Sequence, residues 1–113
     1  MLAASGPLLA VDYTREIKPI FAEHCYRCHG ASQQKSDLRT DTAASLLKGG
    51  KHGPALTSGN SDQSILLQVL KGEHKDLPQM PYNQPALKDD QIALIARWIE
   101  EGAPAPADEK PES

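Results

Sequence analysis

The chain has 113 residues and a formal net charge of -3, which suits one small domain and argues against direct binding of nucleic acid. No stretch approaches the roughly 20 apolar residues of a membrane-spanning helix. Aromatic residues make up only 4% of the chain, with one Phe and one Trp, so the core needs another source of buried apolar surface.

Residues 1–11 are apolar and rich in small side chains, but they lack the basic start and the full length of a secretory signal. We interpret this segment as a leader remnant, a tag or a linker and exclude it from the fold. The expected domain spans residues 12–104.

The first predicted helix begins at Asp12, a residue type that caps helix N-termini, and runs toward Cys25. Its apolar side recurs at helical spacing and consists of Ile17, Ile20, Phe21 and His24. Pro19 removes a backbone hydrogen bond, so the helix either kinks there or restarts with Pro19 as the first residue of a shorter segment. Both versions place Cys25 at the end of the helix.

Two short helices are expected after a polar loop at residues 31–37. Asp41 is predicted to cap the first, which ends at Gly49. Ser61 or Asp62 is predicted to cap the second, which ends at Gly72. Their apolar positions are Ala43, Ala44, Leu46 and Leu47 in the first helix and Ile65, Leu66, Val69 and Leu70 in the second.

Residues 73–87 carry three prolines and cannot form a regular helix. Residues 89–101 form a strongly amphipathic pattern that Gly102 follows, which predicts the last helix. The segment 105–113 is rich in Pro, Ala and charge, and we expect a disordered tail or linker. No strand pattern competes with these helices, so the predicted fold is all-α.

The run Cys25-Tyr26-Arg27-Cys28-His29 is the strongest chemical signal in the chain. A C-x-x-C-H motif is typical of covalent c-type haem attachment, because the two thiols can add to the two vinyl groups of one porphyrin and the histidine can bind the iron. A porphyrin would also supply the apolar surface that the aromatic-poor chain lacks.

The cysteines allow two other interpretations. A zinc site could combine Cys25, Cys28 and His29 with a distant histidine, and a C-x-x-C pair could form a redox disulfide. The disulfide motif accompanies a βαβ pattern that this sequence lacks. Zinc would leave the aromatic-poor core unexplained, so we favour haem because several independent features agree with it.

Met80 is the expected second axial ligand of the iron, because a thioether favours Fe(II) and the other methionine is the first residue. Three prolines at positions 78, 81 and 85 stiffen the loop that carries it. The alternative role of Met80 is core packing, the commoner fate of methionine. His74 lies six residues earlier and could replace Met80 as ligand if the loop rearranged.

Several segments together resemble class I cytochromes c and, more closely, the cytochrome c domain of Planctomycetes-type proteins. The resemblance covers residues 12–104 and rests on Ile17-Lys18-Pro19-Ile20-Phe21, Cys25-Tyr26-Arg27-Cys28-His29-Gly30, Leu38-Arg39-Thr40-Asp41, Gly49-Gly50, Gly53-Pro54-Ala55-Leu56, Met80-Pro81 and Trp98-Ile99-Glu100-Glu101-Gly102-Ala103.

The resemblance implies helices wrapped around one covalent haem c, with Cys25 and Cys28 in thioethers and His29 and Met80 as axial ligands. It implies that the imidazole of His29 donates to the carbonyl of Pro54. It also implies that the helix before the cysteines crosses the last helix, with Phe21 near Trp98.

The implied role is one-electron transfer without enzymatic activity, in the periplasm or cell envelope, with an unidentified redox protein or a fused redox domain as partner. The alternative is a haem module that binds small ligands or reduces peroxide through a weakly held sixth position.

Overall fold

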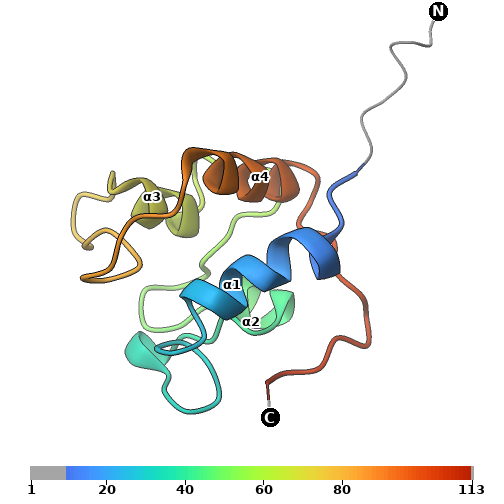
Figure 1. Ribbon diagram of the computed structural model, residues 1–113, viewed down its shortest axis with the longest axis horizontal. Helices are drawn as coiled ribbons and strands as arrows, with labels where there is room; N and C mark the ends of the chain where they lie inside the picture. The colour runs from blue at the N-terminus through green and yellow to red at the C-terminus, as the bar shows by residue number, and fades with distance from the viewer. Residues whose placement is uncertain (1–9, 113) are drawn as a thin grey trace, which may run out of the picture.

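The computed structural model describes residues 10–112, and within this range the protein is helical and has no β-strand, which confirms the all-α prediction. The elements follow one another along the chain (Figure 1) as the π-helical turn η1 (Tyr13–Ile17), α1 (Lys18–His24), the short 3-10 turn η2 (Lys35–Asp37), α2 (Ala43–Lys48), α3 (Ile65–Lys71) and α4 (Asp89–Glu100).

The first helical segment begins and ends where the sequence predicts. The carboxylate of Asp12 accepts a hydrogen bond from the backbone N of Arg15 at 3.2 Å, so Asp12 caps η1. α1 follows η1 directly with Pro19 in its first turn, where a missing N–H is tolerated. Cys25 ends α1, as both expected versions predict, and the separate segment restarts at Lys18, one residue before the Pro19 of the second version.

The N-terminal caps of the next two helices differ from the prediction. Thr42 caps α2, because its hydroxyl accepts from the backbone N of Ser45 at 3.0 Å, and Asp41 is used elsewhere. α3 begins after Ser64, later than the predicted cap at Ser61 or Asp62. Both helices end as predicted, and Gly72 ends α3 in the left-handed conformation at φ 71° that glycine adopts without strain.

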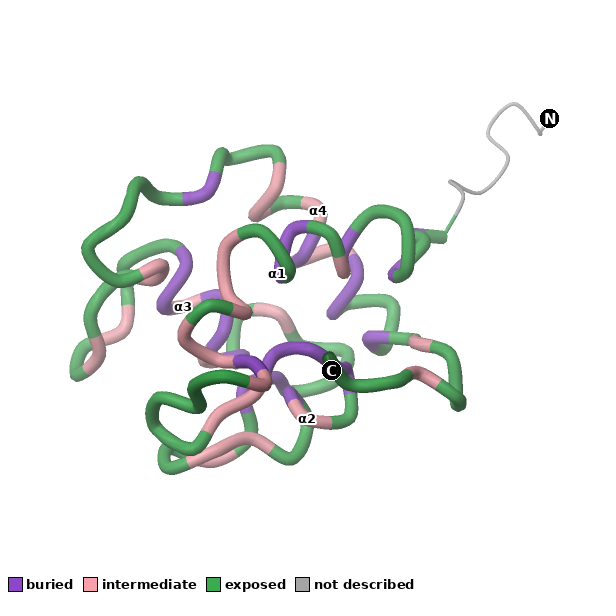
Figure 2. Tube along the Cα trace, turned by 60° about the horizontal axis from the view of Figure 1, so that its bottom comes forward, coloured by how far each residue is buried: buried purple, intermediate pink, exposed green. Residues whose placement is uncertain are grey.

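The core lies where α4 packs against η1 and α3. The fully buried indole of Trp98 stacks on the ring of Tyr13, with the centroids 5.1 Å apart, and meets the edge of Phe21 at 6.1 Å. This confirms the expected contact between Phe21 and Trp98. Figure 2 shows buried stretches on both α1 and α4. Three of the five aromatic residues of the chain therefore gather at one place.

Replacing Trp98 with Ala should lower the free energy of unfolding by about 3–5 kcal/mol, because the substitution leaves a large cavity in the core. Urea unfolding followed by circular dichroism measures the change. Tyr82→Ala is the control, since the side chain of Tyr82 is 61% exposed and its loss should stay within about 0.5 kcal/mol. Equal effects of the two substitutions would contradict this account of the core.

The segment after α4 contacts the helical domain as far as residue 112. The indole N–H of Trp98 donates to the carbonyl of Pro104 at 2.9 Å. The carboxylate of Glu109 accepts from the hydroxyl of Tyr13 at 2.5 Å, from the backbone N of Ala43 at 2.9 Å and from the ammonium of Lys18. This segment, red in Figure 1, thus runs from the end of α4 past α1 and α2.

The predicted leader or linker at residues 1–11 lies almost entirely outside the described residues. Val11 is buried, and its backbone N donates to the carboxylate of Glu101 at 2.9 Å. Within residues 10–112 no helix combines the length and the apolar character needed to span a bilayer.

Candidate haem attachment site

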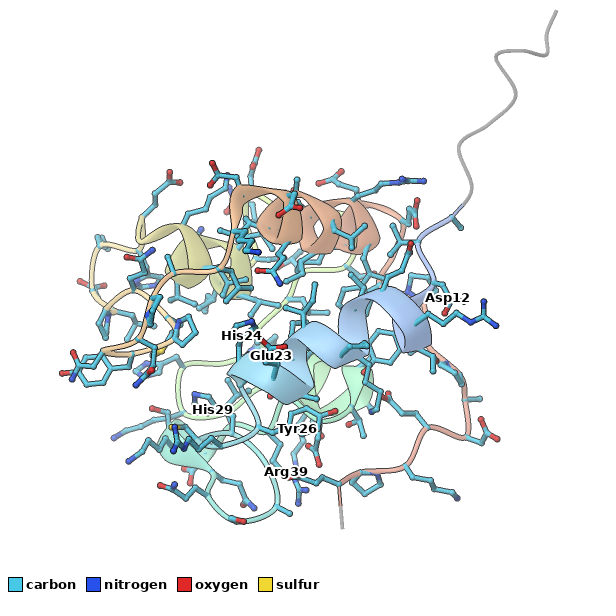
Figure 3. The ribbon with its side chains drawn as sticks, viewed as in Figure 1. Asp12, Glu23, His24, Tyr26, His29 and Arg39 are labelled. Carbon is cyan, nitrogen blue, oxygen red and sulfur yellow. The ribbon has the colours of Figure 1, made fainter. Side chains whose placement is uncertain are left out.

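The two cysteines and the adjacent histidine share one tight turn at the end of α1. The carbonyl of Cys25 accepts hydrogen bonds from the backbone N of Cys28 at 3.2 Å and of His29 at 2.9 Å. The two cysteines and the histidine thus lie within one hydrogen-bonded stretch of backbone, and Figure 3 shows Tyr26 and His29 in this segment beyond α1.

Both thiols are free. Cys25 packs against the hydrophobic core. Its burial, and to a smaller extent the neighbouring Cys28, raises the pKa of the Cys25 thiol to about 12. Catalytic C-x-x-C pairs need a thiol with a lowered pKa, so the raised pKa of Cys25 disfavours the thioredoxin-like interpretation.

The imidazole of His29 is half-buried and held by a backbone carbonyl. Its Nδ1 lies 3.2 Å from the carbonyl oxygen of Leu38. Burial lowers the pKa of His29 and outweighs the hydrogen bonds to the backbone of Leu38 and Lys35, which raise it, so the ring is neutral at neutral pH. A neutral ring with its proton on Nδ1 leaves the lone pair on Nε2 available for a metal.

Leu38 takes the place that the resemblance gives to Pro54. Pro54 is exposed and follows Gly53 in the loop after α2, and the hydrogen bond of Nδ1 goes to Leu38. In the described structure Nδ1 of His29 therefore pairs with Leu38, and the role expected for Pro54 at the haem site stays a prediction. Leu38 lies nine residues after His29, so a short connection brings its carbonyl back to the ring.

Met80 lies in the loop between α3 and α4, at the margin of the core that Cys25 also contacts. Its backbone N donates to the carbonyl of Val69 at 2.8 Å, and the side-chain amide of Gln79 donates to the carbonyl of Leu70 at 3.3 Å. These two bonds attach the loop to the end of α3. The thioether of Met80 is thus held beside the core by a loop without regular helix, as predicted.

The other histidines are placed less favourably. Nδ1 of His74 accepts from the backbone N of Asp76 at 3.0 Å and of Leu77 at 3.1 Å, so the ring stabilises its own turn. His24 lies 3.3 Å from the carboxylate of Glu23 near the end of α1 (Figure 3). His52 is exposed.

Sequence reasoning missed the residues that hold the segment around His29. Asp41 was predicted to cap α2, but its carboxylate is fully buried and accepts from Nε of Arg39 at 3.0 Å and from Nη2 at 2.5 Å. The same carboxylate accepts from the backbone N of Glu112 at 2.8 Å. The spacing of Arg39 and Asp41, two residues apart in the sequence, could have predicted this ion pair.

Gly30, the residue after His29, is required by close packing. A Cβ at this position would lie 2.5 Å from the carbonyl oxygen of Tyr26 and 2.5 Å from a carboxylate oxygen of Glu112. The carboxylate of Glu112 also accepts from the backbone N of Ala31 at 2.9 Å. The C-terminal segment therefore reaches the haem-motif turn only because residue 30 has no side chain.

The buried ion pair predicts how stability depends on pH. Burial tends to raise the pKa of Asp41, but the hydrogen bonds from Arg39 and Glu112 outweigh it and the pKa is lowered. A lowered folded-state pKa stabilises the protein above the unfolded value of about 3.9, and this stability is lost as the pH falls through the folded value. Lys18, Glu109 and Tyr26 are the other charged or titratable groups nearby.

Urea unfolding of the wild type and of Asp41→Asn between pH 7 and pH 2 tests this dependence. The free-energy difference between the two proteins should be largest near neutrality and shrink below about pH 4. A difference that stays constant across this range would show that the charge of Asp41 does not stabilise the fold.

The residues present fit a covalently attached haem. Two free thiols and an imidazole with its Nδ1 engaged occur in one turn, and the turn borders an apolar core. Among residues 10–112 no group of three or more His, Cys, Asp or Glu side chains is arranged to hold a metal ion, so the zinc interpretation gains no support.

The helical fold and the C-x-x-C-H turn together define a cytochrome c-type domain. A family model described as Planctomycete cytochrome C matches residues 25–83, just over half of the chain, and the chain belongs to this family. Membership implies covalently bound haem c and haem-based electron transfer. No curated protein and no solved structure matches the chain.

Proposed function

We propose that this protein transfers single electrons through one covalently attached haem c with His29 and Met80 as axial ligands. The observation that carries the proposal is the turn at residues 25–29, in which two thiols and a carbonyl-bound imidazole lie together at the border of the core. When bound, the haem supplies an iron that gains and loses one electron.

The protein's residues have distinct tasks in this proposal. Cys25 and Cys28 anchor the macrocycle, Nε2 of His29 binds the iron, and the carbonyl of Leu38 fixes the orientation of the ring through Nδ1. The thioether of Met80 would bind the iron as its second protein ligand and would favour the reduced state. A closed sixth position leaves no place for substrate, which is why we propose a carrier and not an enzyme.

We further propose that residues 12–104 form the cytochrome domain and that the segment after them packs on it as an extension. The proposed location is the periplasm or cell envelope, since c-type haem attachment takes place outside the cytoplasm in bacteria with this family. The proposed partner is another redox protein or a fused redox domain.

A pyridine haemochrome assay combined with intact mass tests the proposal on protein made in a host that attaches c-type haem. We expect one haem per chain that remains bound after denaturation. Colourless protein with the mass of the bare polypeptide would reject it.

The spectrum of the ferric protein separates the proposal from the ligand-binding alternative. A thioether-to-iron band supports Met80 as the sixth ligand. A high-spin, five-coordinate spectrum would favour a module that binds small ligands or reduces peroxide.

A further inference from the structure

Residues 38–41 contact both the ring and the backbone of His29. The carbonyl of Leu38 lies 3.2 Å from Nδ1 of the ring. Thr40 donates to the carbonyl of His29 twice, from its backbone N at 2.8 Å and from its hydroxyl at 3.2 Å. The position of the imidazole therefore depends on the conformation of this segment.

Asp41 fixes that conformation from inside the protein. Its side chain is 0% exposed, and its carboxylate binds the guanidinium of Arg39 through two hydrogen bonds that span Thr40. The backbone carbonyl of Asp41 accepts from the ammonium of Lys18 on α1 at 2.6 Å. Because a buried carboxylate is destabilising when its partners are lost, the segment cannot easily leave this arrangement.

We propose that Asp41 is a positioning residue for His29, which keeps the carbonyl of Leu38 directed at Nδ1 by holding Arg39. This inference rests on the proposed function. A firm hydrogen bond to Nδ1 makes the imidazole a stronger donor to the iron and favours Fe(III). Loss of the positioning should therefore raise the midpoint potential of the holoprotein.

Two variants separate positioning from simple electrostatics. Asp41→Asn removes a negative charge, and electrostatics alone would raise the potential. Arg39→Met removes a positive charge, and electrostatics alone would lower the potential or, if Asp41 takes up a proton, leave it unchanged. Positioning predicts that both variants raise it, because both break the bond that spans Thr40.

Asp37→Asn is the matched control. Asp37 is an exposed aspartate on η2, and its substitution makes the same charge change as Asp41→Asn. Solvent screens an exposed charge, so the potential should shift little.

Hydrogen exchange gives a readout that does not depend on electron transfer. The amide of Thr40 should exchange at least tenfold faster in Asp41→Asn and Arg39→Met than in the wild type, and at an unchanged rate in Asp37→Asn. Faster exchange together with a raised potential in Arg39→Met supports the positioning role.

The outcomes distinguish this inference from the proposed function. A wild-type protein without covalent haem or without a reversible redox couple overturns the proposed function and the inference with it. A reversible wild-type couple with a lowered or unchanged potential in Arg39→Met overturns the positioning role alone. If Asp41→Asn does not fold, Arg39→Met decides, since the side chain of Arg39 is 30% exposed.

Discussion

The double substitution Cys25→Ala, Cys28→Ala should yield protein from which acidified organic solvent extracts all haem, whereas wild-type haem should stay with the polypeptide. Both thiols are free and lie in one turn with His29, so they are the attachment points that the turn offers. The covalently bound haem per chain should fall at least tenfold, measured by pyridine haemochrome on the denatured protein.

The two single variants are the controls for this result. Each retains one thiol, so each should keep haem attached through one bond at a reduced yield. The double variant should also lose helical circular dichroism at lower temperature, since Cys25 lies against the hydrophobic core. Haem that survives denaturation on the double variant would contradict attachment at these cysteines.

Met80→Leu should lower the midpoint potential and open the iron to exogenous imidazole. Leucine keeps the apolar volume of methionine but has no sulfur, so it removes ligation while preserving the packing of Met80 beside the core. Because axial ligands set haem potentials over about 0.8 V, the decrease should be on the order of 0.1 V or more. Redox titration and absorbance-monitored imidazole binding measure the two effects.

Met80→Ala and Leu77→Ala complete the comparison. Met80→Ala should match Met80→Leu in potential, because both lack the donor atom. Leu77→Ala disturbs a half-buried side chain of the same loop without touching the thioether, and should leave the potential nearly unchanged. If Met80→Leu behaves as the wild type and only Met80→Ala shifts, Met80 is a packing residue.

The helices could be predicted because their signals are local. The apolar spacing in α3 and α4, the prolines between them and the glycine after α3 each act within a few residues. The start of the first helical segment could also be predicted, because Asp12 accepts its capping hydrogen bond from a residue only three positions away. Local signals of this kind survive in the fold because tertiary packing does not oppose them.

The N-cap of α2 was predicted wrongly because two neighbouring side chains could both form it. Asp41 and Thr42 are neighbouring residues that both suit a helix N-terminus. Thr42 caps α2 because the carboxylate of Asp41 already binds Arg39 and the backbone N of Glu112. Glu112 is far from Asp41 in the sequence. No local pattern reveals such a partner.

The motif of the candidate site could be recognised in the sequence, but the residues that hold His29 in place could not. The C-x-x-C-H run specified the turn itself, while the carbonyl that holds His29 depends on how residues 30–38 fold back. The Pro54 expectation came from the resemblance to class I cytochromes c, whereas Nδ1 of His29 lies beside the carbonyl of Leu38. The contacts of the C-terminal segment could not be predicted, because Glu109 and Glu112 bind residues that are far from them in the sequence.

The packing of Trp98 has a practical consequence. It is the only tryptophan of the chain, it is completely shielded, and the ring of Tyr13 covers one of its faces. Its fluorescence therefore originates from a single site at the junction of α4 and η1, and in haem-free protein the emission would shift to the red when water enters that junction. Unfolding of this domain can thus be followed optically without attaching a dye.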